Sequence, residues 1–185
     1  MTQKLIIGIT GASGVVYGIA LLKSLQKLPI ETHLVISKSG ALNIDIETDY
    51  QLDDVLAMAD HVYDNNNLAA AISSGSFLNS GMIVAPCTIK TLSGIANSYN
   101  DNLVVRAADV AMKEKRKLLL MVRETPLHIG HLKLMLQAAE LGAQILPPFP
   151  AFYHHPKTIM DIVNQTVGKM LDHFHIEHDL FKRWS

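Results

Sequence analysis

The 185-residue sequence contains one cysteine, Cys87, and one tryptophan. A single cysteine excludes a disulfide within the chain and is typical of a reducing compartment, so we expect a cytoplasmic protein. An excess of charge of one sign is also missing, because 16 basic side chains are balanced by 17 acidic ones. Such a chain has no net electrostatic attraction for a polyanion, and we expect no nucleic-acid partner.

Long hydrophobic runs are absent as well. No apolar stretch approaches the roughly 20 residues that span a bilayer, so we expect no membrane segment. We also expect no secretory signal, because Lys4 leads directly into a strand-like run. The hydrophobic share is nevertheless 49%, which is high for a soluble monomer. The surplus apolar surface predicts contacts between subunits.

The N-terminal stretch combines a strand, a small-residue turn and a helix. Residues 5–9 form an unbroken apolar run, which predicts a strand buried on both faces of a parallel sheet. Small residues at 10–14 allow a sharp turn, and apolar positions then recur at helical spacing over 15–28. The start of that helix offers free N–H groups, so we predict a phosphate-bearing ligand at Gly11 to Gly14. Tight packing of the turn is the alternative explanation.

The glycine spacing limits which ligand is expected. Gly11 is followed by Ala12 and Ser13, so the turn does not match G-x-G-x-x-G. The next predicted strand ends at Ser37 and Lys38, where an acidic residue would be needed to bind a ribose. A nicotinamide dinucleotide is therefore disfavoured.

The rest of the chain continues the alternation of strands and helices. The length suits one domain, residues 1–185, with a full core. We predict an α/β fold: a three-layer α/β/α, doubly wound parallel sheet of the Rossmann or flavodoxin type. The further strands are expected at 31–37, 82–85, 117–122 and 144–146, and the helices at 39–46, 51–59, 92–97, 103–115, 128–141 and 158–174.

Two of the predicted strands run into polar loops, at residues 86–91 and 123–127. Ligands of doubly wound sheets bind beyond the carboxyl ends of the strands, so these loops strengthen the prediction of a site. Arg123 and Glu124 could form a surface ion pair of little energetic value. Beside a bound phosphate, Arg123 would instead bind its oxygens and Glu124 could move a proton.

Two other segments are expected to line a site. Residues 72–77 are too small and polar for a core strand and predict a surface loop. The proline- and aromatic-rich run 147–156 predicts a stiff wall or lid. Within it, Tyr153 and Lys157 match Y-x-x-x-K, but Pro156 argues against the helix that this dehydrogenase motif requires.

Cysteine and histidine could also carry chemistry. Cys87 lies beside hydroxyl groups, yet without a histidine near it in sequence a small buried hydrophobe is favoured over a nucleophile. His128 with His131, and His154 with His155, could ligate a metal. Neither pair has a well-placed cysteine or carboxylate, so we predict no metal.

Nine stretches, spread over nearly the whole chain, together resemble a known family. They are Gly8-Ile-Thr-Gly-Ala-Ser-Gly14, Ser37-Lys38, Glu47-Thr-Asp49, 72–77, Pro86-Cys-Thr-Ile-Lys-Thr91, Arg106-Ala-Ala-Asp109, Arg123-Glu-Thr-Pro-Leu127, 147–155 and Arg183-Trp184. Their order and composition are similar to those of the UbiX-like flavin prenyltransferases.

The resemblance implies an enzyme that joins the dimethylallyl group of dimethylallyl phosphate to N5 and then C6 of reduced FMN, without a metal. The product, prenylated FMN, would serve a UbiD-type decarboxylase in ubiquinone biosynthesis or aromatic acid decarboxylation. The resemblance also implies a homo-oligomer, a dodecamer in this family, in which the C-terminal tail (about residues 175–185) packs on a neighbouring subunit.

The family's functional residues carry over by position. Glu47, Glu124 and Ser13 would be catalytic, with Glu47 supplied by a neighbouring subunit. The flavin would be held by Gly11, Ala12, Ser13, Ser37, Thr88, Ile89, Lys90, Thr91 and Arg123. The prenyl phosphate would contact Lys113, Arg123, Glu124, Tyr153, Lys169 and Trp184. Two positions depart from the family pattern, since many members have arginine in place of Lys169 and serine in place of Thr88.

The residue types suit this chemistry. Lys113, Arg123 and Lys169 could stabilise a departing phosphate without a metal. Aromatic side chains such as Phe152 and Tyr153 could line a water-poor pocket for an allylic cation. A released phosphate beside Glu124 could take the proton that is lost when the new ring closes.

Two other functions remain open. An FMN-dependent cysteine decarboxylase shares the fold, but its Pro-x-Met-Asn motif and its histidine after the first helix are missing here. A non-catalytic flavin-binding or assembly subunit of a decarboxylase would not need the residues predicted around a prenyl phosphate.

Overall fold

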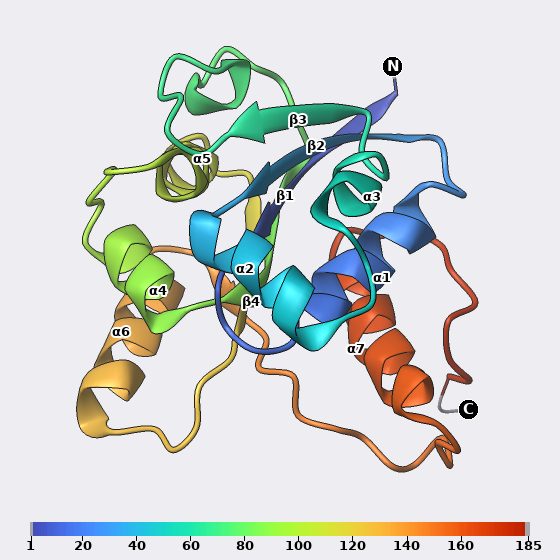
Figure 1. Ribbon diagram of the computed structural model, residues 1–185. Coiled ribbons are helices and arrows are strands. Elements are labelled where there is room, and N and C mark those ends of the chain that lie inside the picture. The colour runs from blue at the N-terminus through green and yellow to red at the C-terminus, as the bar shows by residue number, and fades with distance from the viewer. Residues whose placement is uncertain (1, 184–185) are drawn as a thin grey trace.

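The structure, a computed structural model, describes residues 2–183. A parallel sheet of six strands forms its centre, in the order β3-β2-β1-β4-β5-β6 (Figure 1). The strands are β1 (Gln3–Ile9), β2 (Ile30–Ile36), β3 (His61–Asp64), β4 (Gly81–Cys87), β5 (Lys117–Val122) and β6 (Gln144–Ile145). This strand order is that of the Rossmann fold and confirms the predicted doubly wound α/β class.

Helices cover both faces of the sheet. They are α1 (Val15–Leu25), α2 (Lys38–Glu47), α3 (Leu52–Leu56), α4 (Ile89–Ala96), α5 (Leu103–Lys113), α6 (Ile129–Glu140) and α7 (Ile159–His173), with a 3-10 turn η1 (Ala71–Ser73). Figure 1 shows α1 beside α7, and α4, α5 and α6 grouped on the other side of the sheet. No helix among residues 2–183 is long and apolar enough to cross a membrane.

A hydrophobic core lies on each face of the sheet, and successive residues of the strands contribute to the two cores in turn. Leu5, Ile7 and Ile9 of β1 are fully buried and pack with α1 and α7. Ile6 of the same strand points to the opposite core, which contains residues of α4, α5 and β5. Both faces of β1 are therefore dry, as its continuous apolar run predicts.

The edge strand β3 was missed by sequence reasoning. Its four residues, His61 to Asp64, are polar or largely exposed, so they carry no hydrophobic pattern. The strand forms because β2 offers an open edge, on which His33 to Ile36 pair in register with residues 61–64. Helix α1 was also predicted too long: it ends at Leu25 rather than at residue 28.

The strand order reverses between β1 and β4, and a threonine joins these two strands at their carboxyl ends. Thr10 is 1% exposed. Its hydroxyl donates to the Pro86 carbonyl at 2.8 Å and accepts from the Thr88 backbone N–H at 2.9 Å. This is the position at which sheets of this type leave a crevice for a ligand.

Candidate functional site: a cleft at the carboxyl edge of the sheet

A cleft with a volume of ≈ 770 Å³ opens where the strand order reverses. It is lined by loops that follow β1, β2, β3 and β4, and by parts of α4 and α5. Of the residues predicted to hold the flavin, it is lined by Gly11, Ser37, Thr88, Lys90 and Thr91. Ala12, Ser13 and Ile89 adjoin these residues in sequence without lining the cleft, and Arg123 follows β5 at the same sheet edge.

Besides α5, whose first N–H groups donate to Asn65 and Asn102, two helices direct their N-termini into the cleft. Ser37 caps α2 by accepting from Gly40 N–H at 3.1 Å, and Thr88 caps α4 by accepting from Thr91 N–H at 3.0 Å. Each cap satisfies one N–H of its helix, which leaves others in the first turn for a ligand. Lys38 and Lys90 lie in these first turns and line the cleft. Hydroxyls, helix dipoles and lysines together suit an anionic ligand.

The N-terminus of α1 is arranged differently. Gly14 takes a left-handed conformation there, with φ of +103°. The backbone N–H groups of Gly14 and Val15 both donate to Oε2 of Glu47, at 2.7 and 3.2 Å. The carboxylate therefore occupies the anion position predicted for a phosphate, while the N-termini of α2 and α4 remain open to the cleft. The expected role of Glu47 in a neighbouring subunit stays a prediction.

Close packing also explains part of the glycine turn. A Cβ atom added to Gly11 would lie 2.2 Å from Cβ of Ser39 in the first turn of α2. The turn and α2 therefore approach each other more closely than any side chain allows. Ligand binding and tight packing, the two explanations of this turn, are both compatible with its position at the edge of the cleft.

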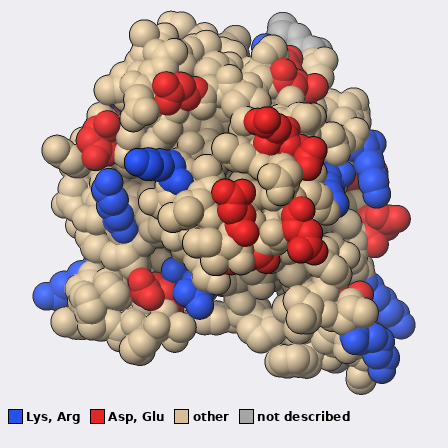
Figure 2. Space-filling view, in the orientation of Figure 1, with Lys and Arg blue, Asp and Glu red and all other residues tan. Residues whose placement is uncertain are grey.

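Charge is distributed unevenly around this face. Acidic side chains gather over α2 and α3, which carry Asp45, Glu47, Asp53 and Asp54, whereas basic side chains lie toward α4 (Figure 2). An anionic group is therefore favoured on the α4 side of the cleft.

Arg123 and Glu124 follow β5 at the same edge of the sheet. The Arg123 backbone N–H donates to the Cys87 carbonyl at 3.2 Å, which fixes the loop beside the end of β4. The exposed carboxylate of Glu124 accepts from its neighbour Thr125 N–H at 2.9 Å. Among the described residues no ion pair is found between Arg123 and Glu124, so a mutual surface salt bridge does not explain them.

Tyr153 and Lys169 are associated with α7. The Tyr153 hydroxyl accepts from Nε2 of Gln165 at 3.4 Å, and Lys169 lies one turn further along the helix. Lys169 Nζ is 3.6 Å from Asp172, a carboxylate also bound bidentately by Arg183 at 2.7 and 3.1 Å. The guanidinium of Arg183 is the main cause that lowers the pKa of Asp172.

The described part of the C-terminal tail packs on its own chain. Besides the contact of Arg183, Nε2 of His178 donates to Oδ1 of Asp172 at 3.1 Å. A Cβ atom on Gly168 would lie 2.5 Å from the Phe181 ring, so the tail also lies against α7. Trp184 lies outside the described residues. Packing of the tail on a neighbouring subunit stays a prediction.

Lys113 lies apart from the other predicted phosphate ligands. It is the last residue of α5, which starts at the cleft with Asn102 as its cap and runs to the amino edge of the sheet, where β5 begins. There Lys113 pairs with Glu114 at 3.1 Å and lines a shallow depression with residues 73–76. One chain therefore does not bring Lys113 together with Arg123 and Glu124.

Cys87 and the Tyr153–Lys157 match behave as expected of residues without a catalytic role. Cys87 is fully buried, and this burial raises the pKa of its thiol far above the ordinary range, so it is no nucleophile. Tyr153 and Lys157 both precede α7, so they share no helical face and the Y-x-x-x-K match is accidental. His128 caps α6 through Nδ1, and its ring lies against that of His131 at a tilt of 35°, so the predicted absence of a metal there stays a prediction.

Sequence reasoning missed several residues of the cleft. Asn65 follows the unpredicted strand β3, and its carbonyl and side-chain oxygens accept from the first N–H groups of α5 at 2.8 and 3.1 Å. Further residues missed on this wall are Asn97, Tyr99, Asp101 and Asn102. The available signal was a run of polar residues just before the helix predicted to begin at 103.

Comparison with known proteins assigns the chain to a family. The model of the family described as "Flavoprotein" matches residues 1–180. Flavin prenyltransferase UbiX of Thauera aromatica is 57% identical over 183 residues, which cover 99% of this chain and 94% of that protein. The chain belongs to the UbiX-like flavin prenyltransferases.

Solved structures agree with this assignment. A crystal structure of AnUbiX (PadA1), in complex with FMN and dimethylallyl pyrophosphate, superimposes with a TM-score of 0.99 at 46% identity and covers 100% of this chain and 98% of that one. A dodecameric FMN-dependent Ubix-like decarboxylase from Escherichia coli O157:H7 gives a TM-score of 0.97 at 50% identity, with coverage of 99% and 100%. The chain is thus an enzyme of the flavin prenyltransferase class.

Proposed function

We propose that this enzyme binds reduced FMN in the cleft and joins to it the dimethylallyl group of dimethylallyl phosphate, first at N5 and then at C6. The product is prenylated FMN. The observation that carries the proposal is the ≈ 770 Å³ cleft at the strand reversal, in a chain whose structural relative holds FMN and dimethylallyl pyrophosphate. A cleft of this size suits a ligand as large as a flavin nucleotide.

The cleft offers a specific place for the FMN phosphate. Two capped helices, α2 and α4, present free first-turn N–H groups, and Ser37, Thr88 and Thr91 add hydroxyls. The N-terminus of α1 is satisfied by Glu47. We therefore assign the phosphate to the N-termini of α2 and α4 rather than to that of α1, and the isoalloxazine ring to the side nearer the end of β5.

The prenyl phosphate needs cations and a proton acceptor. Arg123 follows β5 at the carboxyl edge of the sheet, Lys169 lies on α7, and Tyr153 precedes α7 and contacts its Gln165. We assign these three side chains to the prenyl phosphate from the family resemblance. As the allylic C–O bond breaks, positive side chains stabilise the charge on the departing phosphate. When the ring then closes, the alkene of the transferred group gains a proton and flavin C6 loses one, and we assign this proton transfer to Glu124 or to the phosphate held beside it.

Lys113 can join this site only from another copy of the chain. Within one subunit α5 separates Lys113 from the cleft by the length of the helix, about 16 Å. Large apolar side chains are exposed on α6 (Ile129, Leu132 and Leu136) and on the proline-rich segment (Phe149 and Phe152), as expected of surfaces that pack between subunits. We infer a homo-oligomer, a dodecamer by analogy with the relative from Escherichia coli O157:H7, whose sites combine residues of neighbouring chains.

The decisive experiment measures the mass of the flavin extracted after anaerobic incubation with reduced FMN and dimethylallyl phosphate. We expect a gain of one isoprenoid unit. A flavin of unchanged mass would refute prenyl transfer and favour a flavin-storage subunit or a cysteine decarboxylase. With the variant Glu124→Gln, FMN should still bind while the mass gain is lost. Normal turnover would remove Glu124 from the mechanism.

The shared site has its own test. Lys113→Ala and Glu124→Gln should each abolish product formation. Oligomers reassembled from a mixture of the two variants should recover part of the activity, because some sites then receive both wild-type residues. No recovery, under conditions in which mixed wild-type subunits exchange, would place both residues in one chain's site. Delivery of prenylated FMN to a UbiD-type decarboxylase, in the cytoplasm, completes the proposal.

A further inference from the structure

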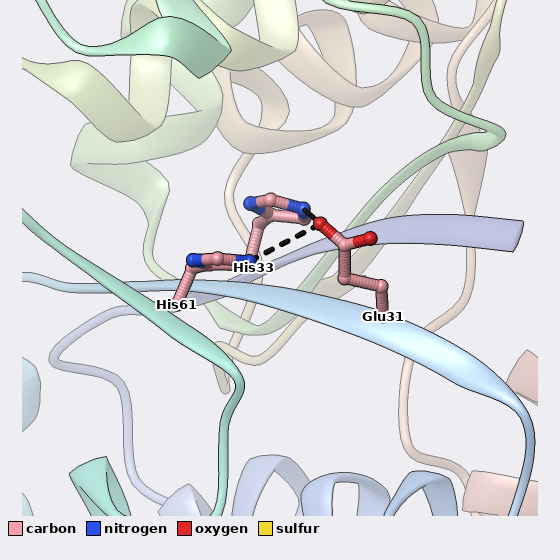
Figure 3. A group of neighbouring side chains, drawn as sticks. All are labelled: Glu31, His33 and His61. Atoms are coloured by element: carbon pink, nitrogen blue, oxygen red, sulfur yellow. Dashed lines mark hydrogen bonds and ion pairs between the residues drawn. The ribbon is translucent and has the colours of Figure 1, made fainter. Parts of the chain in front are cut away.

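Three side chains on β2 and β3 converge away from the cleft. His33 of β2 and His61 of β3 are register partners on adjacent strands, and Glu31 lies two residues before His33 on the same face. Figure 3 shows the two imidazole rings stacked, with one nitrogen of each directed at the Glu31 carboxylate. The centroids of the two rings lie 4.6 Å apart, and the angle between the ring planes is 13°. Sequence reasoning missed this group because β3 was not predicted.

The ligand atoms lie at distances suited to a small divalent metal. Nε2 of His33 is 3.0 Å and Nε2 of His61 is 3.2 Å from Oε1 of Glu31, and all three atoms lie within 4.8 Å of one another. Ligand atoms bound tetrahedrally at about 2.0–2.1 Å are themselves separated by about 3.3 Å. Two of the three separations therefore already match. Because the two rings are nearly parallel, a metal in the plane of the buried His33 ring would not lie in the plane of the His61 ring, so the exposed His61 side chain must turn out of the stack to direct Nε2 at the metal.

We propose that Glu31, His33 and His61 form a binding site for Zn²⁺, with the fourth coordination position open to solvent. Two imidazoles and one carboxylate are a ligand set that zinc accepts, and no thiolate is part of this group. The site is independent of the prenyl-transfer chemistry and lies on the β2–β3 edge of the sheet.

The surroundings of His33 support metal binding. Its side chain is 2% exposed, so packing holds the ring in place with Nε2 toward Glu31. Nδ1 of His33 is 2.9 Å from the Tyr63 hydroxyl. A hydroxyl can donate or accept, so Tyr63 can hold the ring in either tautomer. Such a partner on the second nitrogen is what orients histidine ligands.

The ammonium group of Lys4 would compete with a metal for the Glu31 carboxylate. Its Nζ is 3.0 Å from the same Oε1 of Glu31, and this hydrogen bond is the main cause that lowers the pKa of Glu31. Zinc binding would require Lys4, whose side chain is 36% exposed, to turn away toward solvent. Replacing Lys4 by an uncharged side chain should therefore tighten the site, whereas removing a ligand should weaken it.

A bound zinc would tie the edge strand to the sheet. β3 has four residues and pairs with β2 alone among the described strands. Its last residue, Asp64, is followed by Asn65, which lines the cleft. A metal bound by His61 would fix the first residue of β3 on β2. We therefore expect zinc to raise the stability of the protein.

The test is calorimetric titration of chelator-treated, flavin-free protein with Zn²⁺ alone. We expect one Zn²⁺ per chain, affinity at least tenfold weaker in His61→Gln and in Glu31→Gln, and tighter binding in Lys4→Met. His131→Gln, which alters the other close histidine pair, is the matched control and should bind as wild type. At a hundredfold excess of free zinc over its dissociation constant, Tm should rise by about 5–10 °C.

Each alternative result is decisive. Absence of binding, or binding that survives in His61→Gln and Glu31→Gln but is lost in His131→Gln, would overturn the proposal. Because His61 and Glu31 are partly exposed, both variants should keep the wild-type Tm in the absence of metal to within a few degrees, which separates a lost ligand from a lost fold. Substitution by Co²⁺ gives a second readout, since a tetrahedral site with nitrogen ligands produces intense visible absorption.

Discussion

Replacement of Gly11 by alanine tests how the cleft is built. The added Cβ atom would lie 2.2 Å from Cβ of Ser39 and 3.0 Å from its carbonyl carbon. Ordinary carbon contacts begin near 3.5 Å, so the turn and the N-terminus of α2 must separate by more than about 1 Å. Overpacking of this kind costs about 1–3 kcal/mol. For a chain of this size the loss corresponds to a Tm lower by about 2–12 °C.

The same displacement should weaken FMN binding, because Gly11 and Ser39 both line the cleft. Removing the opposing Cβ atom with Ser39→Gly should restore part of the stability and affinity in the double variant. The comparison is a double-mutant cycle, read by thermal unfolding and by flavin fluorescence titration, with an expected coupling of about 1–2 kcal/mol. Gly142→Ala is the control: its Cβ atom meets nothing within 4 Å, and its φ of +105° alone costs about 1 kcal/mol. Additive effects of Gly11→Ala and Ser39→Gly would refute the steric explanation.

Three further predictions concern buried polarity, charge and thiol chemistry. Thr10→Val should lower the free energy of unfolding by about 1–3 kcal/mol, because the Thr88 N–H loses its buried acceptor. Thr10→Ser is the control and should keep that hydrogen bond. Equal FMN affinity in the two variants would speak against Thr10 as the link between β1 and β4. Arg183→Gln should lower Tm at pH 7. The difference in Tm from wild type should vanish as the pH falls through the lowered pKa of Asp172, because a carboxylate with a lowered folded-state pKa stabilises the fold only while it is ionised. A constant difference between pH 7 and pH 2 would exclude this ion pair as the cause. Cys87 should resist alkylation in the native protein and react after unfolding, as followed by mass spectrometry, and rapid native labelling would contradict its burial.

The fold could be predicted from the sequence where the hydrophobic pattern is strong. β1 and β5 are continuous apolar runs and were found at nearly their true positions. β3 could not be found in this way, because His61 and Val62 are exposed and the strand exists only through its pairing with β2. A short edge strand owes its conformation to its neighbour, which a local pattern does not contain.

The site was predictable in part, for a similar reason. Loops that follow the strands of a parallel sheet lie at one edge of that sheet. The predicted alternation of strands and helices therefore placed Ser37, Thr88 and Arg123 at the same edge. The contact of Glu47 with Gly14 could not be anticipated, because it depends on where α2 ends in space. The convergence of His33 and His61 likewise depends on strand register.

Helix α5 has a consequence for how neighbouring subunits communicate. Its first turn is anchored through Asn65 and Asn102 to one cleft, and its last residue, Lys113, is expected to reach the phosphate of another. Because one helix contains both ends, we expect any shift of its first turn on flavin binding to move Lys113 as well. The eleven residues of α5 would thus couple flavin binding in one cleft to the position of Lys113 at the next. Turnover by adjoining subunits should then be correlated rather than independent.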